Sequence, residues 1–193
     1  MRPVAPRPPP IEFCHMGLAC MDLPRMEDFY TRVLGLKVTD RGRNHNLDLV
    51  FLSRNPAHHH QIVLTSGRPR NIPPNADNPI FGAVINQISF RLNSLADLRE
   101  MHDRVAAEKT GKMIPGNHGI SWSVYFPDPE GNILECFVDT GWYMTLPFME
   151  PLDFARSDAD ITAHTEALCR GRPGFRPMAD WQRSMQSSIA AAP

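Results

Sequence analysis

The sequence has no long apolar run, no excess charge of either sign and no closely spaced cysteine pair, and each absence excludes a class of protein. No apolar stretch approaches the roughly 20 residues that a helix needs to cross a bilayer, and the opening MRPVAPRPPP lacks the apolar core of a signal peptide. The formal net charge of −1 gives no electrostatic case for binding nucleic acid or an anionic membrane. Because the four cysteines form no CxxC pair, we expect reduced thiols in a cytoplasmic protein; they are Cys14, Cys20, Cys136 and Cys169.

The composition that remains is that of an ordinary globular protein. Hydrophobic residues make up 42% of the 193 positions and charged residues 21%. This mixture supports one domain, or two small modules that share one core. The prolines of residues 1–10 predict a flexible arm ahead of it.

Residues 11–66 predict a strand, a helix and three further strands. The segment IEFCHMGLACM has the character of a strand, and Asp22 with Pro24 then opens a helix that Gly35 ends. Three strand candidates follow, with the sequences LKVTD, LDLVFLSR and QIVLTS. The order of this first module is therefore βαβββ.

Residues 84–140 predict the same order again. NQISFRL is typical of a strand, Ser94 caps a helix with a periodic apolar face, and a strand is expected near Met113. The last two strand candidates, SWSVYF and NILECFVD, are separated by the turn sequence DPEG at residues 128–131.

The two halves align at one constant spacing. It is 72 residues for three pairs of positions: His15 and Gln87, the helix caps Asp22 and Ser94, and Val63 and Glu135. Identity between the halves is slight, so the repeat is one of pattern. We predict an α+β fold in which residues 11–140 form one domain from two βαβββ modules, 11–66 and 84–140.

Residues 141–193 lie outside the repeat and predict a C-terminal helical extension. Its first part, GWYMTLPFMEPLDFA, suggests an extended arm, and two capped or amphipathic helices are expected in SDADITAHTEALCR and PMADWQRSMQSSIAAA. The extension either covers the core of its own chain or packs on a second subunit, and the sequence favours neither.

Glu135 is the strongest single indication of chemistry. It lies between Ile133 and Phe137 on one side of a predicted strand. A carboxylate in a low-dielectric interior is costly unless it is paired or bound to a metal. An edge strand facing water, or a buried pair with an arginine, would also explain it; metal ligation is the interpretation we favour.

His15 and Gln87 occupy equivalent positions in the two modules. His15 is expected in mid-strand, where a histidine that is merely hydrogen-bonded is the alternative to a ligand. If the modules pack about a pseudo-twofold axis, His15 and Gln87 lie near one another, and Glu135 reaches the same centre. Val63, the counterpart of Glu135, cannot bind metal, so at most three protein ligands remain and positions stay open for substrate.

Three further side chains are candidates for the same site. Tyr125 shares one side of a predicted strand with Ser121 and Ser123, as in the wall of a cavity, although tyrosine is also common on ordinary half-exposed sheets. His118 closely precedes that strand. His60 ends the cluster His58–His60, for which a solvated loop is the default, and it stands at the entrance of the strand QIVLTS.

These residues carry a resemblance to a known family. The segment GNHGISWSVYFPDPEGNILECF resembles the signature of type I extradiol ring-cleavage dioxygenases, and HHQIVL is similar to the segment that holds their catalytic histidine. The larger pattern, over roughly residues 11–140, resembles the vicinal oxygen chelate superfamily, which includes glyoxalase I and bleomycin-resistance proteins. The resemblance implies paired βαβββ modules that form an open, eight-stranded, barrel-like sheet around a divalent metal.

Carried over by position, the resemblance implies a role for each candidate. His15 and Glu135 would be metal ligands, His60 the acid/base, and His118 a histidine near bound oxygen. Tyr125 would hydrogen-bond the substrate or an intermediate. Gln87 stands where the dioxygenases have a second histidine ligand, although some glyoxalases use a glutamine there.

The resulting expectation is a metal-dependent extradiol-type dioxygenase that acts on a catechol-like substrate with O₂. Fe(II) is the expected metal, with Mn(II), Zn or Ni as alternatives. The other functions left open are a glyoxalase-like isomerase or lyase, against which Val63 counts, and a non-catalytic binding protein. We expect a homodimer or higher homo-oligomer, with no nucleic-acid partner.

Overall fold

The computed structural model describes residues 11–72 and 85–191. The expected flexible arm (1–10), the first position of the predicted second module, much of the connection between the modules and the last two residues of the extension lie outside these ranges.

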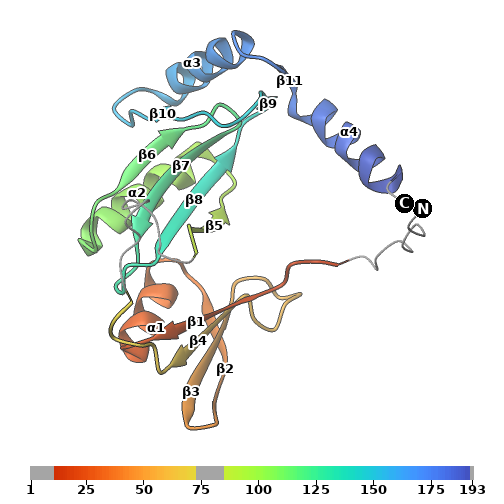
Figure 1. Cartoon of the computed structure of the whole chain (residues 1–193). Coiled ribbons are helices and arrows are strands. Elements are labelled where there is room, and N and C mark those ends of the chain that lie inside the picture. The colour runs from red at the N-terminus through yellow and green to blue at the C-terminus, as the bar shows by residue number, and fades with distance from the viewer. Residues whose placement is uncertain (1–10, 73–84, 192–193) are drawn as a thin grey trace.

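Module one forms a four-stranded sheet with one helix on it (Figure 1). Its elements are β1 (Met16–Cys20), α1 (Leu23–Arg32), β2 (Lys37–Asn44), β3 (Leu47–Ser53) and β4 (Ile62–Ser66), with the sheet order β1-β4-β3-β2. Helix α1 begins where the sequence predicts, because the Asp22 carboxylate accepts a hydrogen bond from the Arg25 amide at 3.1 Å. Its apolar face enters the core through Met26, Phe29 and Tyr30.

Module two repeats this plan and adds a strand. Its elements are β5 (Ile88–Arg91), α2 (Leu95–Glu108), β6 (Ile114–Asn117), β7 (Ser121–Pro127) and β8 (Ile133–Asp139). A short strand of the extension, β10 (Glu150–Pro151), pairs with β6, and the sheet order becomes β10-β6-β7-β8-β5. Helix α2 carries the predicted cap, Ser94.

The α+β fold with two βαβββ modules is confirmed, and the described residues form no closed barrel. The eight module strands are divided between two sheets instead of forming one. The reason is that β1 and β5 are edge strands, which are hydrogen-bonded on one side only, to β4 and β8. The predicted repeat is nevertheless visible in the registers. Gly17 lies opposite Val63, and Ser89, at the equivalent place, lies opposite Glu135.

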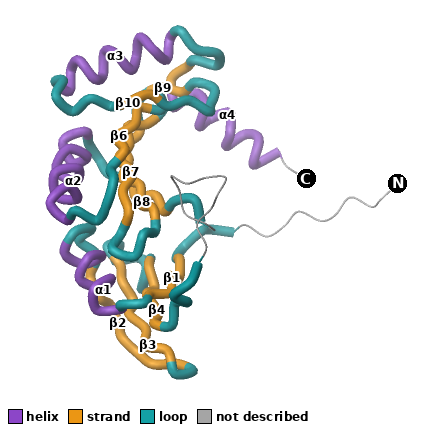
Figure 2. The backbone as a smooth tube through the Cα atoms, turned by 60° about the vertical axis from the view of Figure 1, so that its left-hand side comes forward, coloured by secondary structure: helices purple, strands orange, loops and turns teal. Residues whose placement is uncertain are grey.

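The extension contains β9 (Trp142–Tyr143), β10, α3 (Asp158–Arg170), β11 (Arg176–Pro177) and α4 (Met178–Ala191). Helix α3 covers the end of module two, because buried Thr165 accepts hydrogen bonds there from Asn117 Nδ2 and Trp122 Nε1. Helix α4 projects from the body in both views (Figures 1 and 2). Near its start, the Trp181 ring stacks on Tyr143 with 5.3 Å between the ring centroids.

The turn at residues 128–131 joins module two to module one. Glu130 Oε1 accepts hydrogen bonds from the backbone amides of Met21 and Asp22, at 2.7 and 2.8 Å, where α1 begins. Glu130 Oε2 forms an ion pair with Arg68 at 3.1 Å, and the Glu130 side chain is only 3% exposed. Buried Asp128 accepts a hydrogen bond from the Tyr30 hydroxyl of α1. One turn of module two is thus bound to the start of α1, to its body and to the residues that follow β4.

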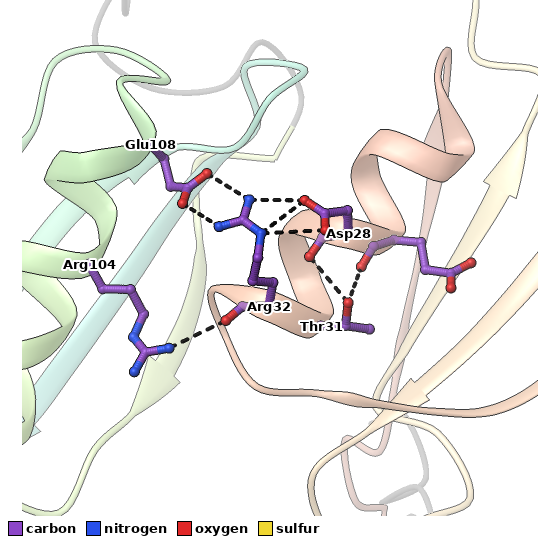
Figure 3. Close-up of polar contacts among 6 residues, drawn as sticks. Asp28, Thr31, Arg32, Arg104 and Glu108 are labelled. Atoms are coloured by element: carbon purple, nitrogen blue, oxygen red, sulfur yellow. Dashed lines mark hydrogen bonds and ion pairs between the residues drawn. The ribbon is translucent and has the colours of Figure 1, made fainter.

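The two helices also meet at their solvent side (Figure 3). Arg32 of α1 holds Glu108 of α2 through two hydrogen bonds and Asp28 of its own helix through its other guanidinium edge. The Arg32 guanidinium keeps the pKa of the Glu108 carboxyl below its usual value. Because Arg32 is 53% exposed, this contact contributes little to the free energy of unfolding, and its main effect is to orient α1 and α2 relative to each other.

The cysteines are all free thiols, as expected. Cys20, Cys136 and Cys169 are buried, and burial raises the pKa of both Cys20 and Cys136 to about 12. Cys14 is exposed, next to His15. Within the described ranges, no helix combines the length and apolar character needed to cross a membrane.

We predict that Glu130→Ala destabilises the protein far more than removal of an exposed carboxylate. The change leaves two backbone amides without their acceptor and the partly buried Arg68 guanidinium without its ion-pair partner, so the free energy of unfolding should fall by roughly 3 kcal/mol. Equilibrium denaturation in urea measures this, with Glu100→Ala in the exposed Glu100–Arg104 pair of α2 as the control, expected to cost less than about 1 kcal/mol. Equal losses for the two variants would contradict the role given to the turn.

Candidate functional site

Glu135 lies inside the sheet of module two. Its strand, β8, is paired with β7 on one side and β5 on the other, and the residue is 7% exposed. Ser89 Oγ donates a hydrogen bond to Glu135 Oε2, and Tyr125, directly opposite on β7, is hydrogen-bonded to the same carboxyl group. Among the described residues Glu135 forms no ion pair with a basic side chain. Two of the explanations left open by the sequence, an edge strand and a buried arginine pair, therefore do not fit the described part of the chain.

Tyr125 links Glu135 to His118. The Tyr125 hydroxyl lies 2.9 Å from His118 Nε2, and His118 Nδ1 lies 2.8 Å from the carbonyl oxygen of Phe148. We call Ser89, Glu135, Tyr125, His118 and the Phe148 carbonyl the polar row. It follows one side of β5, β8 and β7, while the neighbouring side chains Val124 and Cys136 face the core under α2.

Burial and charge act together on Tyr125. Removal from solvent raises the pKa of its phenol well above the ordinary value, and the adjacent Glu135 carboxyl group raises it further. Tyr125 therefore stays a neutral hydroxyl at physiological pH, able to donate one proton and to accept another.

A second group of candidates lies on module one. The rings of His15 and His60 are in contact, with 4.4 Å between their centroids, and Phe51 of β3 packs against His60 at 5.2 Å. Loss of solvent contact lowers the pKa of His60, and electrostatic repulsion from the neighbouring His15 and His59 side chains lowers it further. His60 lies two residues before β4 begins, so it reaches the side of Phe51 and Val63 although regular alternation would place it opposite Val63.

His15 and Gln87 lie just outside the strands to which the sequence assigned them. His15 directly precedes β1 and Gln87 directly precedes β5. The ladder of module one starts only where Met16 meets Ile62, because β4 has no residue in strand conformation before that point. The mid-strand position predicted for His15 was therefore wrong, because the strand begins at Met16, one residue after it. The Gln87 amide oxygen accepts a hydrogen bond from Asn86.

The structure thus brings the candidates together in two sets. His15 and His60 are in contact on module one, and Glu135, Tyr125 and His118 are hydrogen-bonded in series on module two. Within residues 11–72 and 85–191, no three His, Cys, Asp or Glu side chains gather closely enough to hold a metal ion. Between the modules lies a cleft of about 310 Å³, lined on one side by Leu36 and Gln61 and on the other by Ser89 and Phe90.

Two members of the polar row escaped prediction from the sequence. Ser89 was detectable from the 72-residue spacing, which makes it the counterpart of Gly17. In the structure Ser89 is the register partner of Glu135. The Phe148 carbonyl could not be detected from the sequence. It belongs to the extension, where no repeat fixes a register, and every residue type has a backbone carbonyl.

The donors present suit a divalent metal in their chemistry. Glu135 is a buried carboxylate balanced only by the neutral hydroxyls of Ser89 and Tyr125, which leaves its charge largely uncompensated among the described residues. Gln87 stands two residues before Ser89 and can share its side of the strand. An imidazole, an amide oxygen and a carboxylate form a mixed set that several divalent metals accept.

Comparison with known proteins identifies the fold. The model of the Glyoxalase/Bleomycin resistance protein/Dioxygenase superfamily matches residues 13–136. Biphenyl-2,3-diol 1,2-dioxygenases 2 and 3 of Rhodococcus globerulus are 27% and 28% identical over 128 and 125 residues. These matches cover 66% and 65% of this chain, and they span only 63% and 62% of the lengths of those relatives.

Two solved structures share the architecture. A glyoxylase/bleomycin resistance protein/dioxygenase domain from Frankia sp. EAN1pec is 22% identical with a TM-score of 0.54, and the match covers 65% of this chain and 95% of that one. A point mutant of the fosfomycin resistance protein FosX from Listeria monocytogenes, complexed with Mn(II) and 1S,2S-dihydroxypropylphosphonic acid, is 17% identical with a TM-score of 0.51. That match covers 67% of this chain and 93% of the FosX chain. At these identities the likeness establishes the fold alone.

We predict that the Tyr125 phenol of the metal-free protein does not ionise where an ordinary tyrosine does. Absorbance near 295 nm should change equally in the native protein and in Tyr125→Phe between about pH 9 and 11, because burial and Glu135 both oppose a phenolate. In Glu135→Gln the second of these causes is gone, and the pKa of Tyr125 should fall toward the ordinary value. A smaller absorbance change in Tyr125→Phe than in the native protein over this range would contradict the raised pKa of the phenol.

Proposed function

This chain belongs to the Glyoxalase/Bleomycin resistance protein/Dioxygenase superfamily, and from this premise we propose that it is a metal-dependent extradiol-type dioxygenase. Its substrates would be a catechol-like aromatic compound and O₂. The names of the two Rhodococcus relatives support this choice within the superfamily. So does the signature segment from Gly116 to Phe137, which contains Glu135, Tyr125 and His118.

The observation that carries the proposal is the environment of Glu135. A carboxylate that is 7% exposed, in an internal strand and without a basic partner among the described residues, has no structural purpose that would balance its desolvation. A bound cation balances it directly. A protein that only enclosed an apolar ligand would have no use for this charge, which counts against the binding-protein alternative.

Glu135, His15 and Gln87 are the residues that would hold the metal. Fe(II) suits the proposed activity best, with Mn(II), Zn and Ni as the other candidates. When bound, the metal would supply the redox capacity that side chains lack and would hold the catechol oxygens and O₂ within reach of each other. With only three protein ligands, positions remain for both reactants.

The remaining site residues would handle protons. His60 has a pKa below the ordinary value, so its ring is neutral at physiological pH and is ready to accept a proton from a substrate hydroxyl. His118 and Tyr125 form a second proton-holding pair, and the Tyr125 hydroxyl can orient a polar group of the substrate. Phe51, packed against His60, offers an apolar surface for an aromatic ring.

The wider expectations from the sequence remain proposals as well. We place the domain at residues 11–140 and the extension at 141–193, and we expect a cytoplasmic homo-oligomer. The projection of α4 from the body favours contact with a second subunit for this helix, while α3 acts as a cover within its own chain.

We predict that Glu135→Ala abolishes metal retention and leaves the protein folded. Loss of the only carboxylate of the proposed ligand set removes the group that attracts the cation, and it also removes the cost of burying a charge. Metal analysis of anaerobically purified protein measures the effect. Asp139→Ala is the matched control, since Asp139 lies on the same side of β8 but pairs with Arg91 near the surface, and this variant should keep its metal. Unchanged metal content in Glu135→Ala would disprove the ligand assignment.

We predict that Gln87→His increases both iron retention and ring cleavage. Imidazole is a better donor to Fe(II) than an amide oxygen, and the new side chain has a similar volume. A panel of catechols, screened for yellow ring-cleavage products beside iron analysis, measures both quantities. Tight Zn binding by the native protein, together with no cleavage and no gain in iron by the variant, would favour the glyoxalase-like isomerase or lyase. Failure of both forms to bind any metal would leave the binding protein.

A further inference from the structure

We infer that the C-terminal extension is a functional part of the site, because the Phe148 carbonyl fixes which nitrogen of His118 carries the proton. Phe148 is therefore a positioning residue that acts through His118. The effect expected on turnover rests on the proposed function. The protonation pattern itself does not, and it can be measured on its own.

The hydrogen bond between His118 and Phe148 can run in one direction only. A carbonyl oxygen can only accept, so the 2.8 Å contact between His118 Nδ1 and the Phe148 oxygen requires a proton on Nδ1. In a neutral imidazole the other nitrogen is then an acceptor. Nε2 must therefore receive the proton of the Tyr125 hydroxyl, which lies 2.9 Å away.

The carbonyl thereby decides between the two neutral tautomers of His118. Without it, His118 could carry its proton on Nε2 and donate to the Tyr125 hydroxyl. With it, the proton is held on Nδ1, and Nε2 is left as an acceptor.

Contacts on both sides of Phe148 hold the extension in place beside His118. β10 pairs with β6 so that Glu150 lies opposite Asn117, the residue before His118, and Asn117 Nδ2 donates a hydrogen bond to Glu150 Oε1 at 3.0 Å. The Arg172 guanidinium lies over the Phe148 ring, 4.3 Å from its centroid. The extension and the His118 segment are therefore fastened to each other next to the carbonyl.

This role lies outside what the family match assigns. The superfamily model ends at residue 136, and the Frankia domain accounts for 65% of this chain with 95% of its own length. Residue 148 lies beyond the region that the superfamily model matches.

The test compares Phe148→Gly with Phe175→Gly. Both residues belong to the extension and both rings lie under an arginine, Arg172 and Arg170, but Phe175 is not a member of the polar row. Phe148→Gly removes the ring that Arg172 holds and gives the backbone additional freedom, so the carbonyl is no longer fixed. The ¹⁵N chemical shifts of His118 report which nitrogen is protonated, and circular dichroism confirms that each variant is folded.

We predict protonated Nδ1 on His118 in the native protein and in Phe175→Gly, and a shift of the proton toward Nε2 in Phe148→Gly. Turnover of a cleaved catechol should fall about 10-fold to 100-fold in Phe148→Gly and remain unchanged in Phe175→Gly. A native His118 with its proton on Nε2 alone would overturn the inference without any variant, and so would unchanged His118 shifts in folded Phe148→Gly.

A double variant separates positioning from a general structural effect. In a His118→Gln background, Phe148→Gly should lower turnover no further, because the carbonyl acts only through the imidazole. An equal loss in that background would overturn the inference. If the native protein cleaves no catechol at all, the proposed function fails, whereas the ¹⁵N measurement still decides the role of Phe148.

Discussion

The two carboxylates of the turn at residues 128–131 hold the modules in one arrangement, and the rest of the structure depends on this. Glu130 accepts from the amides at the start of α1 and pairs with Arg68, and Asp128 accepts from Tyr30 of the same helix. In the described chain neither β1 nor β5, the edge strands, is hydrogen-bonded to the other module's sheet, so the sheets alone would not fix the relative position of the modules. The same turn sets where β8 begins. It thereby places Glu135 at the level of Ser89 and Tyr125.

The duplicated modules differ most where chemistry is proposed. The register pair Gly17–Val63 of module one is apolar and small, whereas its counterpart Ser89–Glu135 is polar, with the carboxylate buried. Module one has an apolar pair at this place, as is usual for a buried sheet face. Module two has a buried carboxylate there, which costs stability. In the proposed site, module one would contribute instead from the ends of its strands, through His15 and His60, whose rings are in contact. The candidate site is therefore asymmetric although the scaffold is repeated.

Sequence reasoning reached most of the scaffold and about half of the site. Local signals located both module helices and their caps, since Asp22 and Ser94 bond the amides that a cap must satisfy. Alternation placed Tyr125 and Glu135 in the middle of neighbouring strands, and strand-entrance reasoning placed His60. The division into two sheets was not accessible, because alternation within a strand says nothing about what lies beside an edge. The hydrogen bond between His118 and the Phe148 carbonyl could not be predicted either. His118 lies in the repeated modules, but Phe148 lies in the extension, where no repeat or alternation fixes the position of a residue.

The distribution of the cysteines allows a spectroscopic probe to be attached at the start of module one without any substitution. Cys20, Cys136 and Cys169 are buried, and the pKa of the first two lies near 12, so under mild conditions their thiolates are too scarce to react. Cys14 is exposed and directly precedes His15. A maleimide-linked fluorophore or nitroxide would therefore attach at one place in the native chain, beside a proposed ligand. Its signal would report the approach of a paramagnetic ion or a second subunit to that end of β1.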